Sequence, residues 1–568
     1  MNRRQSNFYY LGQEIRLDLK SSSVSPKDIE KNSNRLLVVS AMFSLAFLII
    51  TARLINITIF EKDQEEQVTE NVYQDIRRVK RADITDRNGI IVATSLPTVN
   101  LYATPKNIIY PEASAKKITD VLPDLDYQTV LNRIKSDKTF VYIKRNLTPR
   151  QQLEINNLGL PGLDFEEGET RVYPQGTLLS HIVGLTNIEN SGVSGIEKTF
   201  NDKLLNENKA LKLSIDLRVQ NTVRGILKEN IKKFSAIGGL AIIADVNSGE
   251  IISLVSLPDF DPNNFSDADE NASFNKATLG VFELGSIFKI FNTAMALETG
   301  KVKIDDRFDA SKPLQMAQFK IKDFTPLHRK ISVPEVMVYS SNIGSVQMAL
   351  SVGTEYQKKF LGDLGFTSRM SLEIPELGTP LVPSPWREIN TATISYGYGI
   401  SVTPLHVVSA LSAIVNGGEY ISPTLIARDT GEPIYKRRVI SEETSNMMRA
   451  IMRLVVTNGS GRNANVFGYD VGGKTGSALK VNHKSGYSAK KSLTSFVAGF
   501  PISNPKYAMI VMLDEPAATK DTYGFNTAGW NAVPTAGQII SKVAPQLNLK
   551  PKRKTYVPAW QYLVSAEH

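Results

Sequence analysis

The pattern of apolar and polar positions predicts one long apolar helix near the start of the chain and a large polar body after it. From Leu36 to Ala52 the sequence runs LLVVSAMFSLAFLIITA, 17 residues without a charge. Arg53 follows, and LINITIF extends the apolar character to Phe60. Because Arg53 can reach toward the membrane surface, residues 36–60 are long enough for one span. We therefore predict a transmembrane anchor at 36–60, and no second stretch of this kind follows.

Charge around this anchor predicts its orientation. Residues 1–35 carry seven Lys or Arg against four Asp or Glu, and an excess of basic residues favours the cytoplasmic side. The body after residue 61 then lies across the membrane from the cytoplasm. A cleavable signal peptide is the alternative, but its apolar region is shorter, and no small-residue cleavage site follows this one.

The body divides into two regions by its pattern. Residues 61–80 are polar and charged and suit a stalk. Short strand-like runs with turn signals such as RNG and YPQG then predict a small, mostly β or mixed region to about residue 215. From Ile237, GGLAIIADVNSGEIISLVS predicts a hairpin around residues 247–249. Helical segments follow, and the strands SLTSFVAGFP and YAMIVMLDE close an α/β or α+β domain.

The composition narrows the chemistry of this body. The formal net charge is +9, and the chain has no cysteine and five histidines. Without cysteine, a thiol nucleophile, a cysteine zinc site and a disulfide framework are excluded, and the chain suits an oxidising compartment. No H-E-x-x-H pair occurs, so we expect no metal and no cofactor. The basic residues are scattered, so we expect no nucleic acid as a partner.

The stretch GYDVGGKTGSA, residues 468–478, fits two interpretations. Four positions match the G-x-x-x-x-G-K-[ST] pattern of a phosphate-binding loop, namely Gly468, Gly473, Lys474 and Thr475. That loop needs a good apolar strand before it and a helix after it, and the sequence offers neither. The far side of the membrane also holds little nucleotide. We therefore expect KTGS to form an edge strand, YAMIVMLDE to be a buried strand of the same sheet, and no nucleotide to bind.

A serine and a lysine in FELGSIFKIFNTAMALETG indicate nucleophilic chemistry. Ser286 and Lys289 stand three residues apart at an apparent helix start, so the amine can reach the hydroxyl. The helix N-terminus stabilises a developing alkoxide, and lysine acts as a base where burial and a neighbouring cation lower its pKa. Alone the pair is weak evidence, because S-x-x-K also occurs at 273–276, 477–480 and 488–491.

Two further elements strengthen this evidence. YSSNIG supplies Ser340 and Asn342 in a helical segment. GGKTGSA supplies the single K-T-G of the chain, residues 474–476, followed by Ser477. The order S-x-x-K, S-x-N, K-T-G is that of the serine penicillin-recognising enzymes. Three elements in this order, at domain-scale separations, are strong evidence where each alone is not.

With these motifs the chain resembles a class B penicillin-binding protein, a D,D-transpeptidase, most like the FtsI type used in division. The resemblance runs from the anchor nearly to the C-terminus and includes RADITDRNGIIVATS, RVYPQG, SHIVG, GVSGIEKTF, LSIDLRVQ and ISYGYGISVTPLH. Ala82 replaces a usual glycine, Leu284 a common proline and Ser477 a frequent threonine. None of these departures removes a reacting group.

The resemblance implies a multidomain fold with one N-terminal transmembrane helix, a mixed, mostly-β pedestal domain of the dimerisation type, and an α/β penicillin-binding transpeptidase domain whose β-sheet is flanked by helices. The expected boundaries are a cytoplasmic N-terminus at 1–35, the anchor at 36–60, the pedestal at 61–220, the transpeptidase domain at 221–550 and a tail at 551–568. It also implies the bacterial inner membrane, with the catalytic domain on the periplasmic side.

The resemblance also implies catalytic roles. Ser286 would attack the penultimate D-alanine of a peptidoglycan stem peptide, and Lys289 would accept its proton. Ser340 would relay a proton to the leaving amine, with the positive charge of Lys474 beside it. The backbone N–H groups of Ser286 and Ser477 would form the oxyanion hole, the preorganised charge stabilisation on which acyl transfer depends.

Substrate contacts and partners follow from the same resemblance. Asn342 would bind the side-chain amide of the substrate. Thr475 and Ser477 would bind its terminal carboxylate, and Gly476 would let the strand lie close. β-Lactams would be covalent inhibitors, and an FtsW-type glycan polymerase and other divisome proteins would be partners through the anchor and pedestal.

Other interpretations stay open. The elongation transpeptidase, penicillin-binding protein 2, shares every catalytic motif. A division scaffold with a passenger catalytic domain belongs to a different class of function. A β-lactamase or β-lactam sensor would need a water-activating group that the sequence does not identify, and a bifunctional enzyme would need glycosyltransferase motifs that 61–220 does not show.

Overall fold

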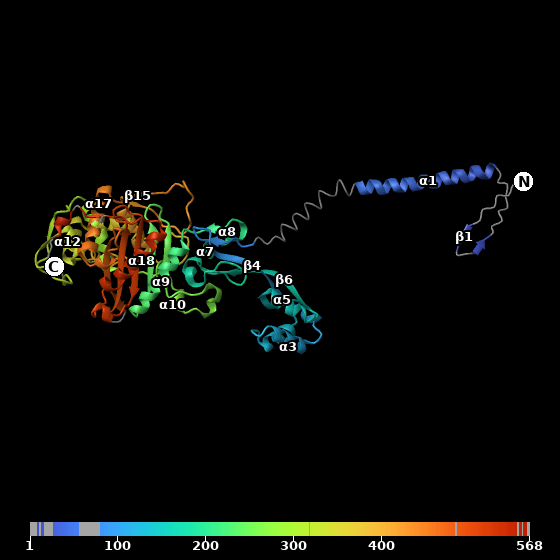
Figure 1. Cartoon of the computed structure of the whole chain (residues 1–568), viewed down its shortest axis with the longest axis horizontal. Helices are drawn as coiled ribbons and strands as arrows, with labels where there is room; N and C mark the ends of the chain where they lie inside the picture. The colour runs from blue at the N-terminus through green and yellow to red at the C-terminus, as the bar shows by residue number, and fades with distance from the viewer. Residues whose placement is uncertain are drawn as a thin grey trace. The chain divides into compact units, whose positions relative to one another are not determined.

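The computed structural model describes residues 8–10, 13–15, 26–55, 80–316, 318–482, 486–553, 556–558 and 560–564. The chain divides into two compact units, Met1–Arg78 and Val79–His568 (Figure 1). The stalk expected at 61–80 lies outside the described residues, apart from Lys80.

One long helix makes up most of the described part of the first unit. α1 spans Pro26–Ile55 and follows a short hairpin of β1 (Phe8–Tyr10) and β2 (Gln13–Ile15). Its stretch Leu37–Leu54 has a mean hydropathy of 2.2 and is not buried, and among the described residues this is the one helix long and apolar enough to cross a membrane. The predicted apolar anchor is therefore a helix and a candidate span, although the helix begins ahead of Leu36 and residues 56–60 lie outside the described part.

The second unit opens with a mixed α/β pedestal whose spine is a five-stranded sheet. The long strand β4 pairs with β3 near its start, and farther along it pairs with β5 on one edge and with β6 on the other. β3 also pairs with β7, in parallel. The strands are β3 (Ile84–Thr85), β4 (Ile91–Ala103), β5 (Val141–Leu147), β6 (Leu163–Val172) and β7 (Leu211–Lys212).

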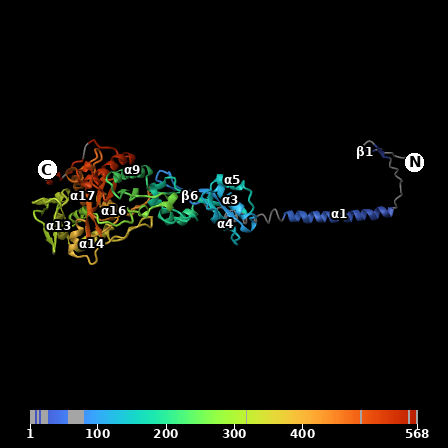
Figure 2. The same cartoon turned by 90° about the horizontal axis from the view of Figure 1, so that it is seen from below.

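Helices make the pedestal more mixed than its strand-like sequence indicates. α3, α4 and α5 gather at one end (Figure 2) around a small apolar core that includes Ile118, Val130 and Ile155. Three short helices lie toward the transpeptidase domain in sequence. The bounds are α3 (Pro111–Val121), α4 (Tyr127–Ile134), α5 (Pro149–Asn156), α6 (Ser180–Val183), α7 (Gly195–Thr199) and α8 (Asn201–Asn206).

A buried charge cluster joins distant parts of the pedestal sequence. Glu197 on α7 accepts hydrogen bonds from the Nε of Arg81 and the Nε of Arg171, each over 2.7 Å. The three side chains are at most 1% exposed. Since removing one partner of a buried ion pair leaves an uncompensated charge, this cluster fixes the segment before β3, the end of β6 and α7 to one another.

The transpeptidase domain is built on an antiparallel sheet in the order β16-β17-β18-β8-β9. β8 (Gly238–Asp245) and β9 (Ile251–Leu257) form the predicted hairpin, and β18 (Tyr507–Asp514) is the predicted buried strand. β16 (Gly472–Asn482) and β17 (Gly486–Phe500) complete the sheet. The K-T-G-S segment therefore lies on an edge strand, as predicted, with a second strand and not a helix after it.

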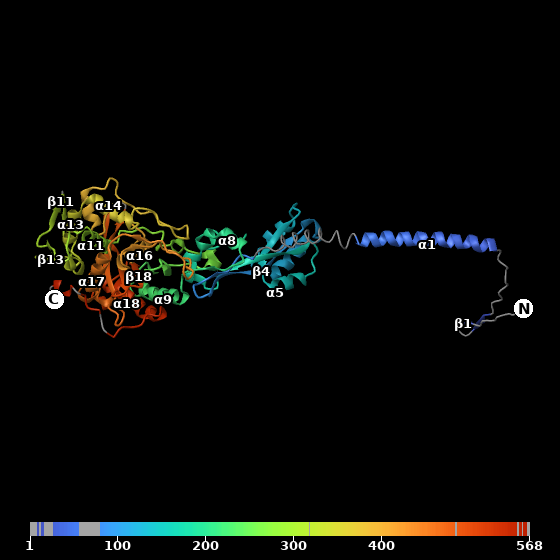
Figure 3. The ribbon, with the colours of Figure 1, turned by 90° about the horizontal axis from the view of Figure 1, so that it is seen from above.

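Helices cover both faces of this sheet because both faces are apolar. Along β8, Leu240 and Ile242 pack into one core, whereas Ala241 and Ile243 pack into the other. α9 and α18 lie on one side, and α11 and α16 on the other (Figure 3). This arrangement confirms the predicted sheet flanked by helices.

The helices and minor strands of this domain have the following bounds. The helices are α9 (Leu217–Lys233), α10 (Glu270–Ser273), α11 (Phe288–Glu298), α12 (Val333–Val338), α13 (Asn342–Val352), α14 (Thr354–Asp363), α15 (Glu388–Ile394), α16 (Pro404–Val415), α17 (Glu442–Asn458) and α18 (Ala532–Gln546). Three two-stranded ribbons pair β10 (Arg307–Asp309) with β13 (Lys330–Ser332), β11 (Leu314–Met316) with β12 (Phe319–Ile321), and β14 (Glu419–Tyr420) with β15 (Arg437–Arg438).

Candidate active site

Three segments far apart in the sequence meet at one place in the transpeptidase domain. Ser286 lies in η5 (Gly285–Ile287), a single 3₁₀ turn that leads directly into α11. Ser340 lies in the break between α12 and α13, and Lys474 lies on β16. Hydrogen bonds between the side chains of these segments connect the three predicted motifs.

Glycines allow the backbone of Ser286 to lie close to the edge strand. A Cβ at Gly476 would stand 2.5 Å from the carbonyl oxygen of Leu284, so only glycine lets β16 approach η5 this closely. Gly397 has φ +88° and packs against the Gly285 carbonyl oxygen, which a Cβ there would overlap. The turn that carries Ser286 is therefore held between two backbone segments.

Lys289 lies at the centre of the site. Its Nζ is 2.9 Å from Ser286 Oγ, 2.8 Å from the Ser340 carbonyl oxygen, 3.1 Å from Ser340 Oγ and 2.7 Å from Asn342 Oδ1. The side chain is fully buried, while Ser286 itself is half-buried. The amine thus reaches the serine from inside the domain.

The surroundings of Lys289 favour the neutral amine. Burial lowers its pKa well below the usual 10.5, the charge of Lys474 lowers it further, and the carboxylate of Asp323 acts in the opposite direction. A neutral amine has two N–H donors and one lone pair. The Ser340 carbonyl and the Asn342 amide oxygen can take the two donors, which leaves the lone pair for the proton of a serine hydroxyl.

Ser340 connects the two lysines. Its Oγ lies 3.1 Å from Lys289 Nζ and 3.0 Å from Lys474 Nζ. Lys474 is also fully buried, and burial lowers its pKa to about 7. A hydroxyl can donate and accept at once, so this arrangement offers a proton path from one amine to the other.

The predicted substrate-binding residues lie around this path. Asn342 donates from its Nδ2 to the Lys322 carbonyl oxygen over 2.9 Å, so its amide is already held within the protein at both ends. The Thr475 hydroxyl lies 2.7 Å from Ser460 Oγ. Ser477 accepts a hydrogen bond from the Ala528 backbone over 3.2 Å. Their roles toward a substrate stay predictions.

The other S-x-x-K matches differ in their surroundings. Ser273 donates to the Glu270 carbonyl oxygen over 2.9 Å. Lys480 forms ion pairs with Asp514 and Glu515. Asp514, the last residue of β18, is therefore paired with a lysine. Among the described residues, no group of three or more His, Cys, Asp or Glu is placed to hold a metal.

Two residues near the site were missed by sequence reasoning. Asp323 accepts hydrogen bonds from the S-x-N turn, and Ser460 contacts Thr475. Neither belongs to a motif: Asp323 stands 18 to 20 residues before its partners, and Ser460 stands 15 residues before Thr475. No local signal points to them, because only the folded chain brings each to the site.

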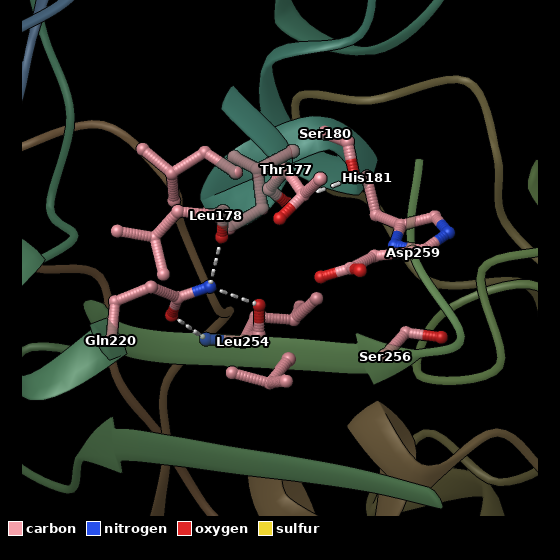
Figure 4. A pocket seen from close by; sticks show the side chains of 11 residues that line it. Thr177, Leu178, Ser180, His181, Gln220, Leu254, Ser256 and Asp259 are labelled. Atoms are coloured by element: carbon pink, nitrogen blue, oxygen red, sulfur yellow. Dashed lines mark hydrogen bonds between the residues drawn. The ribbon is translucent and has the colours of Figure 1, made fainter. Parts of the chain in front are cut away.

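A separate small cavity lies where the pedestal meets the transpeptidase domain (Figure 4). It measures about 10 Å³, room for about one water molecule. Gln220 closes it by donating to the carbonyl oxygens of Leu178 and Leu254, and by accepting from the Leu254 backbone. Its lining includes none of the predicted site residues.

Comparison with known proteins identifies the family. A model of the penicillin-binding protein dimerisation domain matches residues 76–222, and a model of the penicillin binding protein transpeptidase domain matches residues 239–534. The chain is 34% identical over 484 residues to the probable peptidoglycan D,D-transpeptidase FtsI of Caulobacter vibrioides, covering 83% of this chain and 82% of that one. The chain belongs to the class B penicillin-binding proteins of the FtsI type.

One further relative and two solved structures extend the comparison. The peptidoglycan D,D-transpeptidase FtsI of Escherichia coli is 28% identical over 510 residues, 84% of this chain and 85% of that protein. Penicillin-binding protein 3 of Mycobacterium tuberculosis, solved with aztreonam, has a TM-score of 0.66 at 22% identity and covers 84% of this chain and 99% of that one. The transpeptidase domain of Burkholderia pseudomallei penicillin-binding protein 3 has a TM-score of 0.54 at 31% identity, covering 60% and 98%.

Proposed function

We propose that this class B penicillin-binding protein cross-links peptidoglycan stem peptides by serine acyl transfer during septum synthesis. One observation carries the proposal: the amine of Lys289 lies 2.9 Å from Ser286 Oγ and, through Ser340 Oγ, is linked to Lys474. This is a nucleophile, a base and a proton relay in mutual contact.

The acylation step follows from this geometry. Ser286 Oγ attacks the carbonyl carbon of the penultimate D-alanine, and its proton passes to the lone pair of Lys289. The backbone N–H groups of Ser286 and Ser477 hold the oxyanion of the tetrahedral intermediate. The C–N bond then breaks, and the proton moves from Lys289 through Ser340 Oγ to the departing amine of the terminal D-alanine. An ester between Ser286 and the shortened stem peptide remains.

The deacylation step reverses the proton path. The amine of a second stem peptide attacks the ester carbonyl, gives up a proton through the same residues, and forms the cross-linking amide as Ser286 regains its hydroxyl. The carboxylate of the terminal D-alanine would bind Thr475 and Ser477, whose hydroxyls lie on the edge strand β16. β-Lactams would acylate Ser286 in the same way, because their strained amide presents a similar carbonyl and carboxylate.

Cellular setting and partners belong to the same proposal. The excess of basic residues in 1–35 supports a periplasmic catalytic domain on the inner membrane, with an FtsW-type polymerase and other divisome proteins as partners. Relatives named FtsI support a division role over an elongation role. The boundaries expected at 36–60, 61–220 and 221–550 also stay proposals. The dimerisation-domain match, residues 76–222, runs two residues past the expected end of the pedestal at 220, and the transpeptidase-domain match, residues 239–534, lies inside 221–550.

Release of D-alanine tests the proposal. Full-length protein in detergent is incubated with a pentapeptide donor ending in D-Ala-D-Ala and with an amine acceptor. The expected result is D-alanine release and a donor–acceptor product, both lost in Ser286→Ala. Release that continues in Ser286→Ala would overturn the serine mechanism, and division supported in cells by Ser286→Ala would favour the scaffold.

A further inference from the structure

Asp323 lies beside the active site without belonging to any of its motifs. It follows β12 by two residues, in the loop that runs toward β13, and it is half-buried. It makes three hydrogen bonds to the S-x-N segment, and the carbonyl of the neighbouring Lys322 makes one. Its carboxylate therefore lies against the segment that carries Ser340 and Asn342.

The Asp323 carboxylate takes hydrogen bonds from three consecutive residues of the S-x-N turn. Its Oδ2 accepts from Ser341 Oγ over 2.7 Å. Its Oδ1 accepts from the backbone N–H of Asn342 over 2.6 Å and from that of Ile343 over 3.0 Å. These N–H groups belong to the first turn of α13, where a carboxylate is favoured by the helix dipole and by the unpaired donors.

This turn needs support because it is in an uncommon conformation. Ser340 has φ +57°, a left-handed backbone that costs a non-glycine residue free energy. In that conformation the carbonyl and hydroxyl oxygens of Ser340 both face Lys289. The Lys322 carbonyl, next to Asp323, holds the Asn342 amide so that its oxygen also faces Lys289.

The negative charge of Asp323 also affects the pKa of Lys289. From the elements packed around α11, the charged groups that act on the Lys289 amine are Lys474 on β16 and Asp323 on the β12–β13 loop. The carboxylate favours the protonated amine and Lys474 favours the neutral one. After Ser286 gives up its proton, Lys289 is an ammonium ion, and Asp323 then offsets part of the repulsion from Lys474.

We propose that Asp323 is a positioning residue for acyl transfer: its carboxylate fixes the turn of Ser340 and Asn342 around Lys289, and its negative charge stabilises the ammonium form that follows proton transfer. This inference rests on the proposed function and extends it to a residue outside the three motifs.

Acylation by a chromogenic cephalosporin across a pH series tests the inference in the full-length protein in detergent. Asp323→Asn keeps the shape of the side chain but removes its negative charge, and Asp323→Ala removes both. Asp323→Glu keeps the negative charge on a longer side chain. The matched control is Asp126→Asn, because Asp126 caps α4 in the pedestal with one backbone N–H and one hydroxyl, over 2.8 and 2.9 Å. Melting temperatures measured alongside verify that each variant is folded.

The expected results separate positioning from simple stability. Acylation requires neutral Lys289, so its rate rises with pH, and loss of the carboxylate charge lowers the pKa of Lys289. The acid limb, the part of the curve of acylation rate against pH where the rate rises, therefore moves to lower pH in Asp323→Asn. Asp323→Glu restores the limb of the parental protein. In Asp323→Ala the turn is misplaced, so the plateau acylation rate falls about 100-fold. Asp126→Asn keeps the acylation rate and the acid limb of the parental protein.

Two opposite results have distinct meanings. An unmoved acid limb in folded Asp323→Asn, together with a parental rate in folded Asp323→Ala, would overturn the role of Asp323 and leave the proposed function intact. Failure of the parental protein to be acylated at all, in the same assay, would overturn the proposed function itself.

Discussion

At the scale of single residues, the site is organised around two buried amines. Lys289 and Lys474 are both fully buried, and the hydroxyl of Ser340 lies between them. Burying two lysines costs stability unless they are neutral or paired. Burial lowers the pKa of both amines, and a lysine in its neutral form is a base that can accept the proton of a serine hydroxyl.

Substitution of Lys289 by arginine tests the base directly. A guanidinium keeps the positive charge but does not lose its proton in proteins, so Lys289→Arg is expected to slow β-lactam acylation by about 10²–10⁴-fold, the usual contribution of general base catalysis. Stopped-flow acylation rates measure this. Lys276→Arg, at the lysine of another S-x-x-K match, is the control and keeps the parental rate. A parental rate in Lys289→Arg would exclude lysine as the base.

Substitution of Lys474 predicts a pH shift of defined sign. The charge of Lys474 lowers the pKa of Lys289, so Lys474→Gln raises that pKa. Because acylation needs neutral Lys289, the acid limb of the rate moves to higher pH, opposite to the shift expected for Asp323→Asn. The plateau rate also falls, since Ser340 loses a partner. An acid limb that stays in place would contradict the charge coupling between the two lysines.

The sequence predicts which residues gather at the site better than it predicts their protonation states. Ser286, Lys289, Ser340 and Lys474 follow from motif order, and the structure brings them together. Their protonation does not follow from the motifs, because it depends on burial and on charges from distant segments. Asp323 is such a charge, and no spacing rule marks it.

At the scale of elements, the site depends on how closely η5, β16 and the loop after α15 approach one another. Gly476 and Gly397 lie where a side chain would meet the backbone of η5. Gly285 also donates its backbone N–H to the Gly397 carbonyl oxygen over 3.2 Å. The position of Ser286 is thus fixed by backbone contacts on both sides.

Gly397→Ala tests this packing. Its Cβ would overlap the Gly285 carbonyl oxygen, so η5 must shift, and a displacement of about 1 Å at a nucleophile costs about 100-fold in rate. The control is Gly353→Ala, where φ is also positive, at +99°, but no atom lies within 4 Å of the added Cβ. Both variants lose some stability from backbone strain. Equal acylation rates in the two would show that the contact at Gly397 does not position Ser286.

Most elements are predicted by the apolar pattern, and the exceptions have tertiary causes. The β8–β9 hairpin, the edge strand β16 and the buried strand β18 agree with the sequence. The break at Ser340 between α12 and α13 does not follow from it, because the segment VPEVMVYSSNIGSVQMALSVG has no internal glycine or proline at the break. Capping by Ser341 and Asp323 stabilises the new helix start instead.

At the scale of the whole molecule, the Glu197 cluster ties the pedestal together. Two arginines share one glutamate, and one of them, Arg171, also reaches the Arg81 carbonyl oxygen. The sequence motifs contain all three residues, but motif matching does not show that they touch. This connection is a property of the fold.

Glu197→Gln tests the cluster. Loss of the negative charge leaves two buried guanidinium groups without compensation, which costs about 3–5 kcal/mol of unfolding free energy. A lower melting temperature and faster amide hydrogen exchange in the pedestal are expected. Glu154→Gln removes an exposed pair with Arg150 and is expected to change stability by less than about 1 kcal/mol. Similar melting temperatures in both variants would show that the buried cluster contributes no net stability.

The central claim, that Ser286 is the nucleophile of a penicillin-recognising acyl transferase, is tested most directly by mass. Full-length protein in detergent is incubated with a penicillin, its intact mass is measured, and the modified peptide is mapped. The account predicts one stable adduct, heavier by the mass of the intact penicillin, on the peptide that carries Ser286, and no adduct in Ser286→Ala. An unmodified folded protein, or an adduct that persists in Ser286→Ala, would contradict it.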